Sequence, residues 1–342
     1  MTKIAVVQPA LALAEVDRNL ARVEDLVRDA HREHAPEIII VPEGCSSPNV
    51  YSRLLLNGPR PVDGAPFQLI TRLARELGCI VGGGFLAVRG RHSYGTYVLA
   101  EPDGAVHLHD KDIPTAWEQN YYKGGDDDGV VESSTLGVKV GLMSGWEWAR
   151  NRTSARVRDG GAQLVLGGMC WPSFPTNWPG PLRTLCRHEH EQWVRQAMEL
   201  PGLVARRTGV AVAHAAHVGP ITGETPLAPG LSWPTVMVGG SQITERDGTI
   251  LASLSLEDGE GHVAADVQVA PATPLDATED RLWIQDFSLL TNAAWYGMNA
   301  HGNLRYRLRH ARKGFGWQAW PSGDLPDEIP AGGAAAGALA TS

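Results

Sequence analysis

The sequence predicts an α/β fold, and three features of its 342 residues support that prediction. Short apolar runs typical of strands alternate with segments whose apolar residues recur at helical spacing. Several runs are apolar at consecutive positions, as expected for sheets that are covered by helices. With 43% hydrophobic residues the chain can bury a sizeable core, arranged as one large domain or as two.

Strands and helices alternate regularly in the first part of the chain. Helices are predicted at 67–77 and at 16–31, where Val16, Leu20 and Val23 begin an apolar face. A Pro102-Asp103-Gly104 turn signal separates the last two strands of this part. The predicted strands are 3–8, 37–41, 79–84, 95–100 and 105–109.

The second part continues the alternation, which is typical of α/β proteins. Helices are predicted at 149–159 and 186–208, and a hairpin at 235–250 turns around Arg246-Asp247-Gly248. The predicted strands are 138–143, 163–166 and 210–214.

The C-terminal region differs in composition from the rest of the chain. Residues 280–320 are rich in aromatic side chains, which we expect to pack on the body or on a partner chain. The last residues are rich in alanine and glycine and are expected to be flexible. We therefore predict a main domain at 1–270, an extension at 271–328 and a tail at 329–342.

Composition argues against several classes of protein. The net charge is −8, and no basic block stands out, so nucleic acid is not an expected partner. No apolar run of about 18 residues exists, which argues against a membrane span. The N-terminus resembles a first strand more than a signal peptide. Four cysteines without metal-ligand spacing are expected to be reduced thiols of a cytoplasmic protein.

Glu43 is the first candidate for chemistry. It follows Pro42 directly after the predicted strand 37–41, and ligands of α/β folds bind at strand ends. A carboxylate there can act as a general base, especially when burial raises its pKa. The alternative is a solvated glutamate in a turn.

Lys111 and Glu118 form the second candidate pair. A buried Lys111 would stabilise negative charge that develops on an oxygen or nitrogen, whereas a surface lysine between two aspartates would only form salt bridges. Glu118 lies seven residues later, past a proline, and can return to the same pocket. The acidic run 126–128 is expected to be a solvated face without a role.

The third candidate is the junction that follows the predicted strand 138–143. A strand-to-helix junction is a usual place for a nucleophile, because N–H groups at a helix start can hold an oxyanion. Ser144 carries the only nucleophilic side chain there, and its alternative role is to cap the helix.

These segments resemble the signatures of the nitrilase (carbon–nitrogen hydrolase) superfamily. They are Pro42-Glu43-Gly44, the run KDIPTAWE from Lys111 to Glu118, and the run VGLMSGWE from Val140 to Glu147. A later Gly-Ser-Gln-Ile at 240–243, followed by Arg-Asp-Gly, resembles the family's late hairpin. The similarity extends from residue 3 to about residue 269 and is nearest to the branch that includes the nitrilases proper.

The resemblance implies a four-layer α-β-β-α sandwich and a catalytic set. Glu43 would be the general base, Lys111 the oxyanion stabiliser and Glu118 the second glutamate of that set. In the family a cysteine thiolate attacks a nitrile or amide carbon, and activated water then resolves the adduct. Because that cysteine stands directly before an aromatic residue and a glutamate, Gly145 occupies its position here.

The resemblance also implies a small-molecule substrate and a homodimer or higher homo-oligomer, in which the C-terminal segment crosses to the partner. No metal or cofactor is expected. Trp117, Trp146 and Trp171 would suit a flat or apolar part of the substrate, and core packing is their alternative role. Glu147, Cys170 and His214 complete the candidate substrate contacts. Of His214 and His217, one is expected to contact the pocket and the other to lie in the core.

Glycine at position 145 leaves three interpretations open. The chain can be an inactivated form of an ordinary hydrolase of nitriles or amides. It can be a natural enzyme without the cysteine that uses Glu43 and Lys111 for acid–base chemistry such as cyclisation, condensation or elimination. It can also be a binding protein on an enzyme fold, because fold alone does not fix function. Cys170 could replace the thiol only if its sulfur came within about 3–3.5 Å of the carbon attacked.

Overall fold

Two β-sheets stacked face to face form the centre of the computed structural model, which describes residues 1–225 and 228–313. The first sheet has the order β15-β1-β2-β4-β5-β6, with β3 paired to β4. Its strands are β1 (Thr2–Gln8), β2 (Ile38–Ile40), β3 (Arg60–Pro61), β4 (Ile80–Arg89), β5 (His92–Ala100), β6 (Val106–Asp110) and β15 (Gly261–Val267).

The second sheet has the order β14-β13-β10-β9-β8-β7, and a separate ribbon is formed by two further strands. The strands of the sheet are β7 (Val130–Ser133), β8 (Val138–Ser144), β9 (Leu164–Met169), β10 (Ala211–Ala216), β13 (Ser241–Thr244) and β14 (Ile250–Leu254). The antiparallel ribbon consists of β11 (Val218–Thr225) and β12 (Ala228–Val238).

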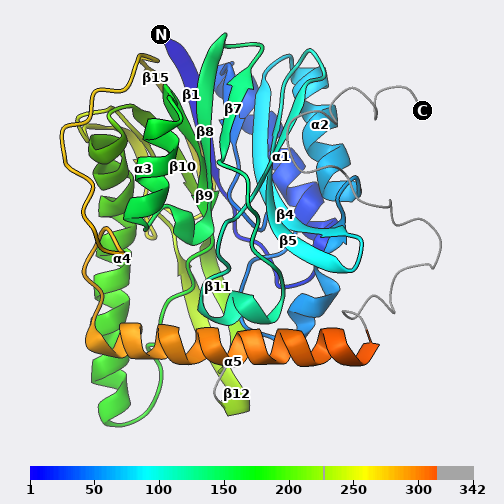
Figure 1. Cartoon of the computed structure of the whole chain (residues 1–342), viewed down its shortest axis with the longest axis vertical. Coiled ribbons are helices and arrows are strands. Elements are labelled where there is room, and N and C mark those ends of the chain that lie inside the picture. Colours follow the sequence, from blue (N-terminus) through cyan, green and yellow to red (C-terminus); the bar gives the residue numbers. More distant parts are fainter. Residues whose placement is uncertain (226–227, 314–342) are drawn as a thin grey trace.

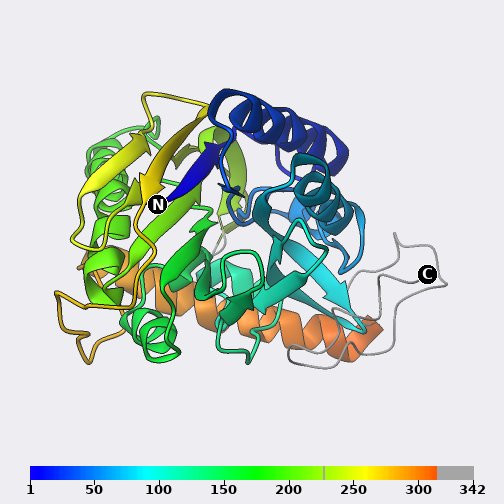
Figure 2. The same cartoon turned by 90° about the horizontal axis from the view of Figure 1, so that it is seen from above.

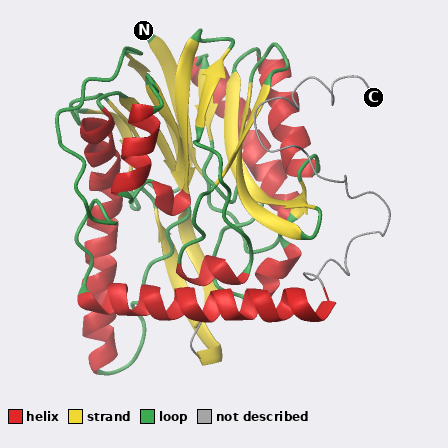
Figure 3. Cartoon of the chain, in the orientation of Figure 1, coloured by secondary structure: helices red, strands yellow, loops and turns green. Residues whose placement is uncertain are grey.

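Helices cover the outer face of each sheet and complete four layers (Figures 1 and 3). The first sheet carries α1 (Val16–His34) and α2 (Ala65–Leu77), and the second carries α3 (Asn151–Asp159) and α4 (Pro181–Thr208). In the described part of the chain, the connections contain the 3₁₀ turns η1 (Arg53–Asn57), η2 (Ala116–Asn120) and η3 (Gly145–Glu147). The predicted α-β-β-α sandwich is therefore confirmed.

Three apolar clusters correspond to the interfaces between these layers. One lies between the sheets, where Ile4, Ile38 and Ile40 of the first sheet pack with residues such as Leu142 and Leu166 of the second. The other two lie beneath the helices of each outer layer. The strands have two buried faces for this reason, which explains their unbroken apolar runs.

The helix α1 shows how the sequence pattern produces this packing. Val16, Leu20, Val23, Val27 and neighbouring apolar residues form its buried face. The helix ends at His34, because Ala35 adopts a left-handed conformation and donates its N–H to the carbonyl of His31. The helix α4 begins earlier than the predicted 186–208, since Gly180-Pro181 is a favourable helix start.

The late hairpin differs from its prediction. The strand β12 pairs with β11, and the turn around Arg246-Asp247-Gly248 joins β13 to β14 instead. The predicted hairpin 235–250 therefore combined the end of β12 with β13 and with the turn that leads to β14. Sequence pattern alone does not specify which strands pair across the chain.

A long helix, α5 (Leu289–Lys313), crosses one end of the sandwich (Figures 1 and 2). It packs against η2, and Gly302 allows the close approach, because a Cβ there would lie 2.9 Å from Cβ of Gln119. Among the described residues, this part of the aromatic extension contacts the chain's own body through η2. Phe315, Trp317, Trp320 and the predicted tail 329–342 lie outside them. No helix among the described residues is both long and apolar enough to cross a membrane.

Candidate functional site

Glu43, Lys111 and Glu118 meet in the interior at the end of the sandwich that α5 crosses. The Lys111 ammonium donates to both oxygens of Glu118, at 2.9 and 2.7 Å, and lies 3.4 Å from Oε2 of Glu43. All three side chains are buried. We call these residues and Ser144 the Glu43 cluster.

Local structure explains this meeting. Glu43 lies just beyond β2, and Lys111 directly follows β6, so both leave the first sheet at strand ends. Glu118 lies on η2, where its Oε2 accepts the backbone N–H of Thr115 at 2.6 Å in a capping box. The cap therefore fixes the carboxylate that binds Lys111.

Burial and charge tune the cluster. Desolvation raises the pKa of Glu43 to about 7, with Lys111 opposing the shift and Glu118 adding to it. For Lys111, desolvation alone would lower the pKa, but the carboxylates of Glu118 and Glu43 outweigh it and raise the pKa. The result is a cationic ammonium beside a carboxyl that can gain or lose a proton near neutral pH.

Gly145 lies against this cluster at the start of η3. Its φ of +58° is a left-handed conformation that favours glycine. A Cβ at this position would lie 2.2 Å from Oε2 and 2.5 Å from Oε1 of Glu43, and 2.4 Å from Nζ of Lys111. A side chain at position 145 would thus point at the acid–base pair, and only the flexible ends of two side chains would have to shift.

Ser144 has the capping role that the sequence left open. Its hydroxyl accepts the backbone N–H of Glu147 in a second capping box. The same hydroxyl donates to Oε2 of Glu43 at 3.1 Å. Ser144 therefore ties the helix start to the general-base candidate.

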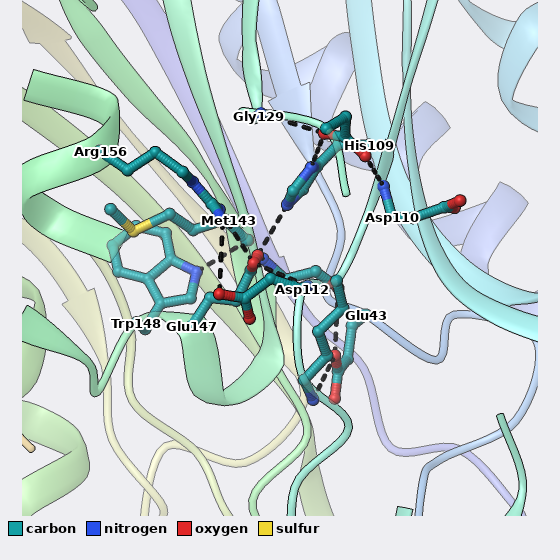
Figure 4. A network of polar contacts seen from close by, with 12 residues as sticks. Glu43, His109, Asp110, Asp112, Gly129, Met143, Glu147, Trp148 and Arg156 are labelled. Atoms are coloured by element: carbon teal, nitrogen blue, oxygen red, sulfur yellow. Dashed lines mark hydrogen bonds and ion pairs between the residues drawn. The ribbon is translucent and has the colours of Figure 1, made fainter. Parts of the chain in front are cut away.

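Glu147 was expected to contact the substrate. It instead belongs to a buried network of charged side chains (Figure 4). One of its oxygens bonds to Nε2 of His109 at 2.7 Å and the backbone N–H of Ser144 at 2.9 Å. The other accepts from Arg156 and from the backbone N–H of Asp112, both at 3.0 Å. Four hydrogen bonds leave this buried carboxylate no capacity for a substrate.

The acidic run 126–128 was expected to be a solvated face without a role, and Asp127 shows that this expectation was wrong. Its carboxylate bonds to Nδ1 of His109 and accepts the backbone N–H of Asp110. Burial alone would lower the pKa of His109, but Glu147 and Asp127 outweigh it and raise that pKa to about 10. We call His109, Asp127, Glu147 and Arg156 the Glu147 network.

The three candidate tryptophans take different places. Trp146 and Trp171 pack on each other, with ring centroids 4.9 Å apart, and both contact Trp193 in the cluster beneath α4. Trp117 lies on η2 directly before Glu118 and lines two pockets. Trp146 borders the smaller of these pockets as well as the core.

Cys170 and His214 are held in structural contacts. The backbone N–H of Asn49 donates to Sγ of Cys170 at 2.9 Å, and burial raises the pKa of this thiol well above its usual range. A neutral, hydrogen-bonded thiol is a poor nucleophile. His214 packs on Trp148 and donates to the carbonyl of Gly240 at 3.1 Å. His217 is the histidine at the site, since its Nε2 donates to the carbonyl of Glu43 at 2.6 Å.

Two further residues, which were not among the candidate site residues, join the site. Asn49 donates from Nδ2 to Oε1 of Glu118 at 2.8 Å. The Tyr122 ring lies 5.9 Å from the Lys111 ammonium and borders a small cavity with Glu43 and Asn49. Both belong to irregular segments whose course depends on tertiary packing.

No cation-binding set is evident in this cluster. Among the described residues, one group of three has metal-ligand spacing, formed by Glu33, His34 and His262 on α1 and β15. Nε2 of His34 and Nδ1 of His262 are 3.1 Å apart, and Glu33 is largely exposed. This group takes no part in the site.

Comparison with known proteins places the chain in a family. The model of carbon–nitrogen hydrolases matches residues 3–275. A mutant of the Nesterenkonia AN1 amidase from the nitrilase superfamily is 19% identical, with a TM-score of 0.57, 78% of this chain and 90% of that chain covered. A CN-hydrolase superfamily protein of Xanthomonas campestris, solved with an arsenic adduct in its active site, is 18% identical, with a TM-score of 0.56 and coverage of 77% and 89%. At these identities the two structures show the fold alone.

No curated protein matches the sequence significantly. The family model nevertheless covers most of the chain, including Glu43, Lys111, Glu118 and position 145. The chain belongs to the carbon–nitrogen hydrolase family.

Proposed function

We propose that this protein acts on a small-molecule amide or nitrile by proton transfer through Glu43, with Lys111 stabilising the charge that develops. The observation that carries the proposal is the buried Glu43 carboxyl, whose pKa is about 7, beside a cationic Lys111. A group that titrates near the working pH can both accept and donate a proton. The family's thiol step has no counterpart at Gly145.

The unpaired oxygen of Glu43 supports this role. Oε1 of Glu43 has no hydrogen-bond partner among the described residues, and the Glu43 carboxylate borders the small cavity that Asn49 and Tyr122 also line. Buried carboxylate oxygens are normally paired, so an unpaired one is suited to a reacting group. The same oxygen lies 2.5 Å from the point that a Cβ at position 145 would occupy.

Hydrolysis of an amide illustrates the chemistry that this arrangement permits. Glu43 takes a proton from a water molecule as the water oxygen bonds to the amide carbon. Lys111 stabilises the resulting oxyanion. The carbon–nitrogen bond then breaks, and the proton passes from Glu43 to the leaving nitrogen, which yields an acid and an amine or ammonia. Additions and eliminations use the same proton transfers.

A second candidate is a thiol-dependent hydrolase that the glycine has disabled. The observation in its favour is the direction of the missing Cβ, which would place a thiol between Glu43 and Lys111. The retained cluster fits both candidates, whereas a pure binding protein has no need of all three charged groups.

The deciding experiment compares this chain with Gly145→Cys on a panel of amides and nitriles, read by ammonia release and mass spectrometry. Turnover by the glycine form, abolished by Glu43→Gln, supports proton-transfer chemistry. Turnover by the cysteine form alone, with an adduct on the new thiol, establishes the disabled hydrolase instead. If both forms are inert, the binding protein becomes the better interpretation.

We infer further that the protein is a cytoplasmic homodimer or higher homo-oligomer whose ligand is a small molecule and not nucleic acid. All four cysteines are buried and unpaired, and the net charge is −8. One face of α5 exposes Leu289, Tyr296, Leu304 and Leu308. Deletion of the residues after Asp280 should leave monomeric or insoluble protein. A truncated chain that still forms a dimer in light scattering would contradict this inference.

A further inference from the structure

An apolar pocket lies beneath α5 beside the Glu43 cluster. Its volume is about 160 Å³, and its walls include Tyr51, Trp117, Phe174, Trp193 and Trp233. A smaller pocket of about 40 Å³ shares Trp117, Phe174 and Trp193 with it. The two pockets are therefore adjacent, and we call them together the α5 chamber.

The helix α5 supplies one wall of this chamber. Ala294 and Met298 line both pockets from the same face of the helix. Near the start of the helix, Ser288 and Thr291 bond to Oε2 of Glu189 on α4, at 3.0 and 3.1 Å.

The far part of α5 is anchored to the other half of the sandwich. There the Tyr306 hydroxyl lies 2.7 Å from Nδ1 of His92 on β5. Since α5 is thus held to both halves of the sandwich, it acts as a fixed cover.

The chamber adjoins the Glu43 cluster through two pairs of neighbouring residues. Trp117 precedes Glu118, whose carboxylate holds Lys111. Val50 lines the larger pocket and follows Asn49, which also bonds to Glu118. A ligand in the chamber would therefore lie next to the residues that hold the ammonium.

We propose that the α5 chamber binds one aromatic ring of the substrate, with α5 as its cover. This inference rests on the proposed function, because it names the substrate class of the same site. A volume of about 160 Å³ is close to the roughly 150 Å³ of a buried apolar cavity that binds benzene. Five aromatic side chains in the wall of this pocket favour a flat apolar group.

Two polar features define the ring further. Nε1 of Trp117 is buried and has no acceptor among the described residues, so the ring is expected to carry an acceptor such as a hydroxyl oxygen or a ring nitrogen. Glu224 is a carboxylate in the wall, where it accepts from Ser52 and from the backbone of Arg53. A carboxylate on the ring would be repelled by Glu224, so the preferred substituent is neutral.

The test measures binding by titration calorimetry with three amides and the full chain. Phenylacetamide and 4-hydroxyphenylacetamide should bind at least about tenfold more tightly than propionamide, a difference of about 1.4 kcal/mol. Ala294→Trp fills the chamber and should weaken both aromatic ligands at least about tenfold, whereas Ala293→Trp, on the exposed face of the same turn, should not. 4-Hydroxyphenylacetamide should bind more tightly than phenylacetamide, and Trp117→Phe should remove only this difference.

Each outcome has a distinct meaning. Equal affinity for aromatic and aliphatic amides, or equal effects of Ala293→Trp and Ala294→Trp, overturns the chamber proposal. Should Ala294→Trp fail to fold by circular dichroism, Met298→Trp tests the same wall. Tight aromatic binding without any turnover leaves the chamber standing and removes the proposed function. Turnover of aliphatic and aromatic amides with equal KM keeps the function and removes the chamber.

Discussion

Two buried charge clusters flank Gly145, and they differ in how completely their oxygens are hydrogen-bonded. Glu147 accepts four hydrogen bonds, two on each oxygen. Glu43 has one paired oxygen and one without a partner among the described residues. A fully satisfied carboxylate stabilises the fold, whereas an incompletely satisfied one remains available to a reacting molecule.

The pKa values of the two carboxylates move in opposite directions. Desolvation acts on both and raises the pKa in each case. At Glu147 the charges of His109 and Arg156 outweigh it, so the pKa lies well below the ordinary range. At Glu43 burial dominates and Glu118 adds repulsion, so the pKa rises to about 7. Neighbouring charges therefore determine that the Glu147 carboxylate stabilises the fold, whereas the Glu43 carboxyl can exchange a proton.

The largest effect on stability should follow from Glu147→Ala. This change removes the buried carboxylate that pairs with both His109 and Arg156, which keep only Asp127 and Asp112 as partners, and breaking such a buried ion pair costs about 3–5 kcal/mol. Urea unfolding measures the loss, with Glu132→Ala on an exposed strand position as the control, expected within about 0.5 kcal/mol. A loss below about 1 kcal/mol at Glu147 would remove the structural role assigned to the network.

Glu43→Gln should give the opposite pattern, with a large effect on catalysis and a small one on stability. Activity on any substrate found should fall at least about 100-fold, because the proton-transfer group is lost. The free energy of unfolding at pH 8 should rise or change by less than about 1 kcal/mol, because the substitution removes a carboxylate charge that burial disfavours. Parallel kinetics and urea unfolding test this, and destabilisation equal to that of Glu147→Ala would erase the distinction.

The pH dependence of stability should separate the two clusters. His109 has a pKa raised from 6.5 to about 10, so its contribution is fully present below pH 6.5 and is lost as the pH rises to 10. Glu43 has a pKa raised from 4.5 to about 7, so its contribution is lost earlier, between pH 4.5 and 7. Urea unfolding from pH 4 to 10 should show that His109→Asn flattens the upper window and Glu43→Gln the lower one. Loss of both windows in one variant would show that the clusters titrate together.

The activity of the wild-type chain should follow the same group. If Glu43 accepts a proton, the rate should rise with pH and level off above about 7, its pKa in the fold. The pH profile of kcat/KM measures this. A rate that does not change between pH 5 and 9 would assign proton transfer to another residue.

Gly145→Ala should have a moderate effect on stability. An alanine at φ +58° costs about 1–2 kcal/mol of backbone strain. The ends of Glu43 and Lys111 can shift to admit one methyl group, so the fold should persist. Thermal unfolding compared with Gly137→Ala, at another positive φ but with no atom near its Cβ, isolates the contribution of the crowded site. Equal losses at both positions would show that the crowding is without energetic effect.

The sequence by itself determined the layers and the three catalytic candidates. Strands with consecutive apolar residues bury both faces, and Glu43 and Lys111 each follow a strand. Glu43, Lys111 and Glu118 therefore met as the resemblance implied, and the absence of a side chain at position 145 was visible at once.

Only the tertiary structure decided which charges are structural and what covers the site. Glu147 depends on His109, 38 residues away, and Asn49 reaches Glu118 across 69 residues. The helix α5 has no sequence motif, yet it anchors to His92 through Tyr306, 214 residues apart. Residue types and spacing predict local conformation, but such long-range partners depend on how the layers pack, and it is these partners that fix the protonation state of each group.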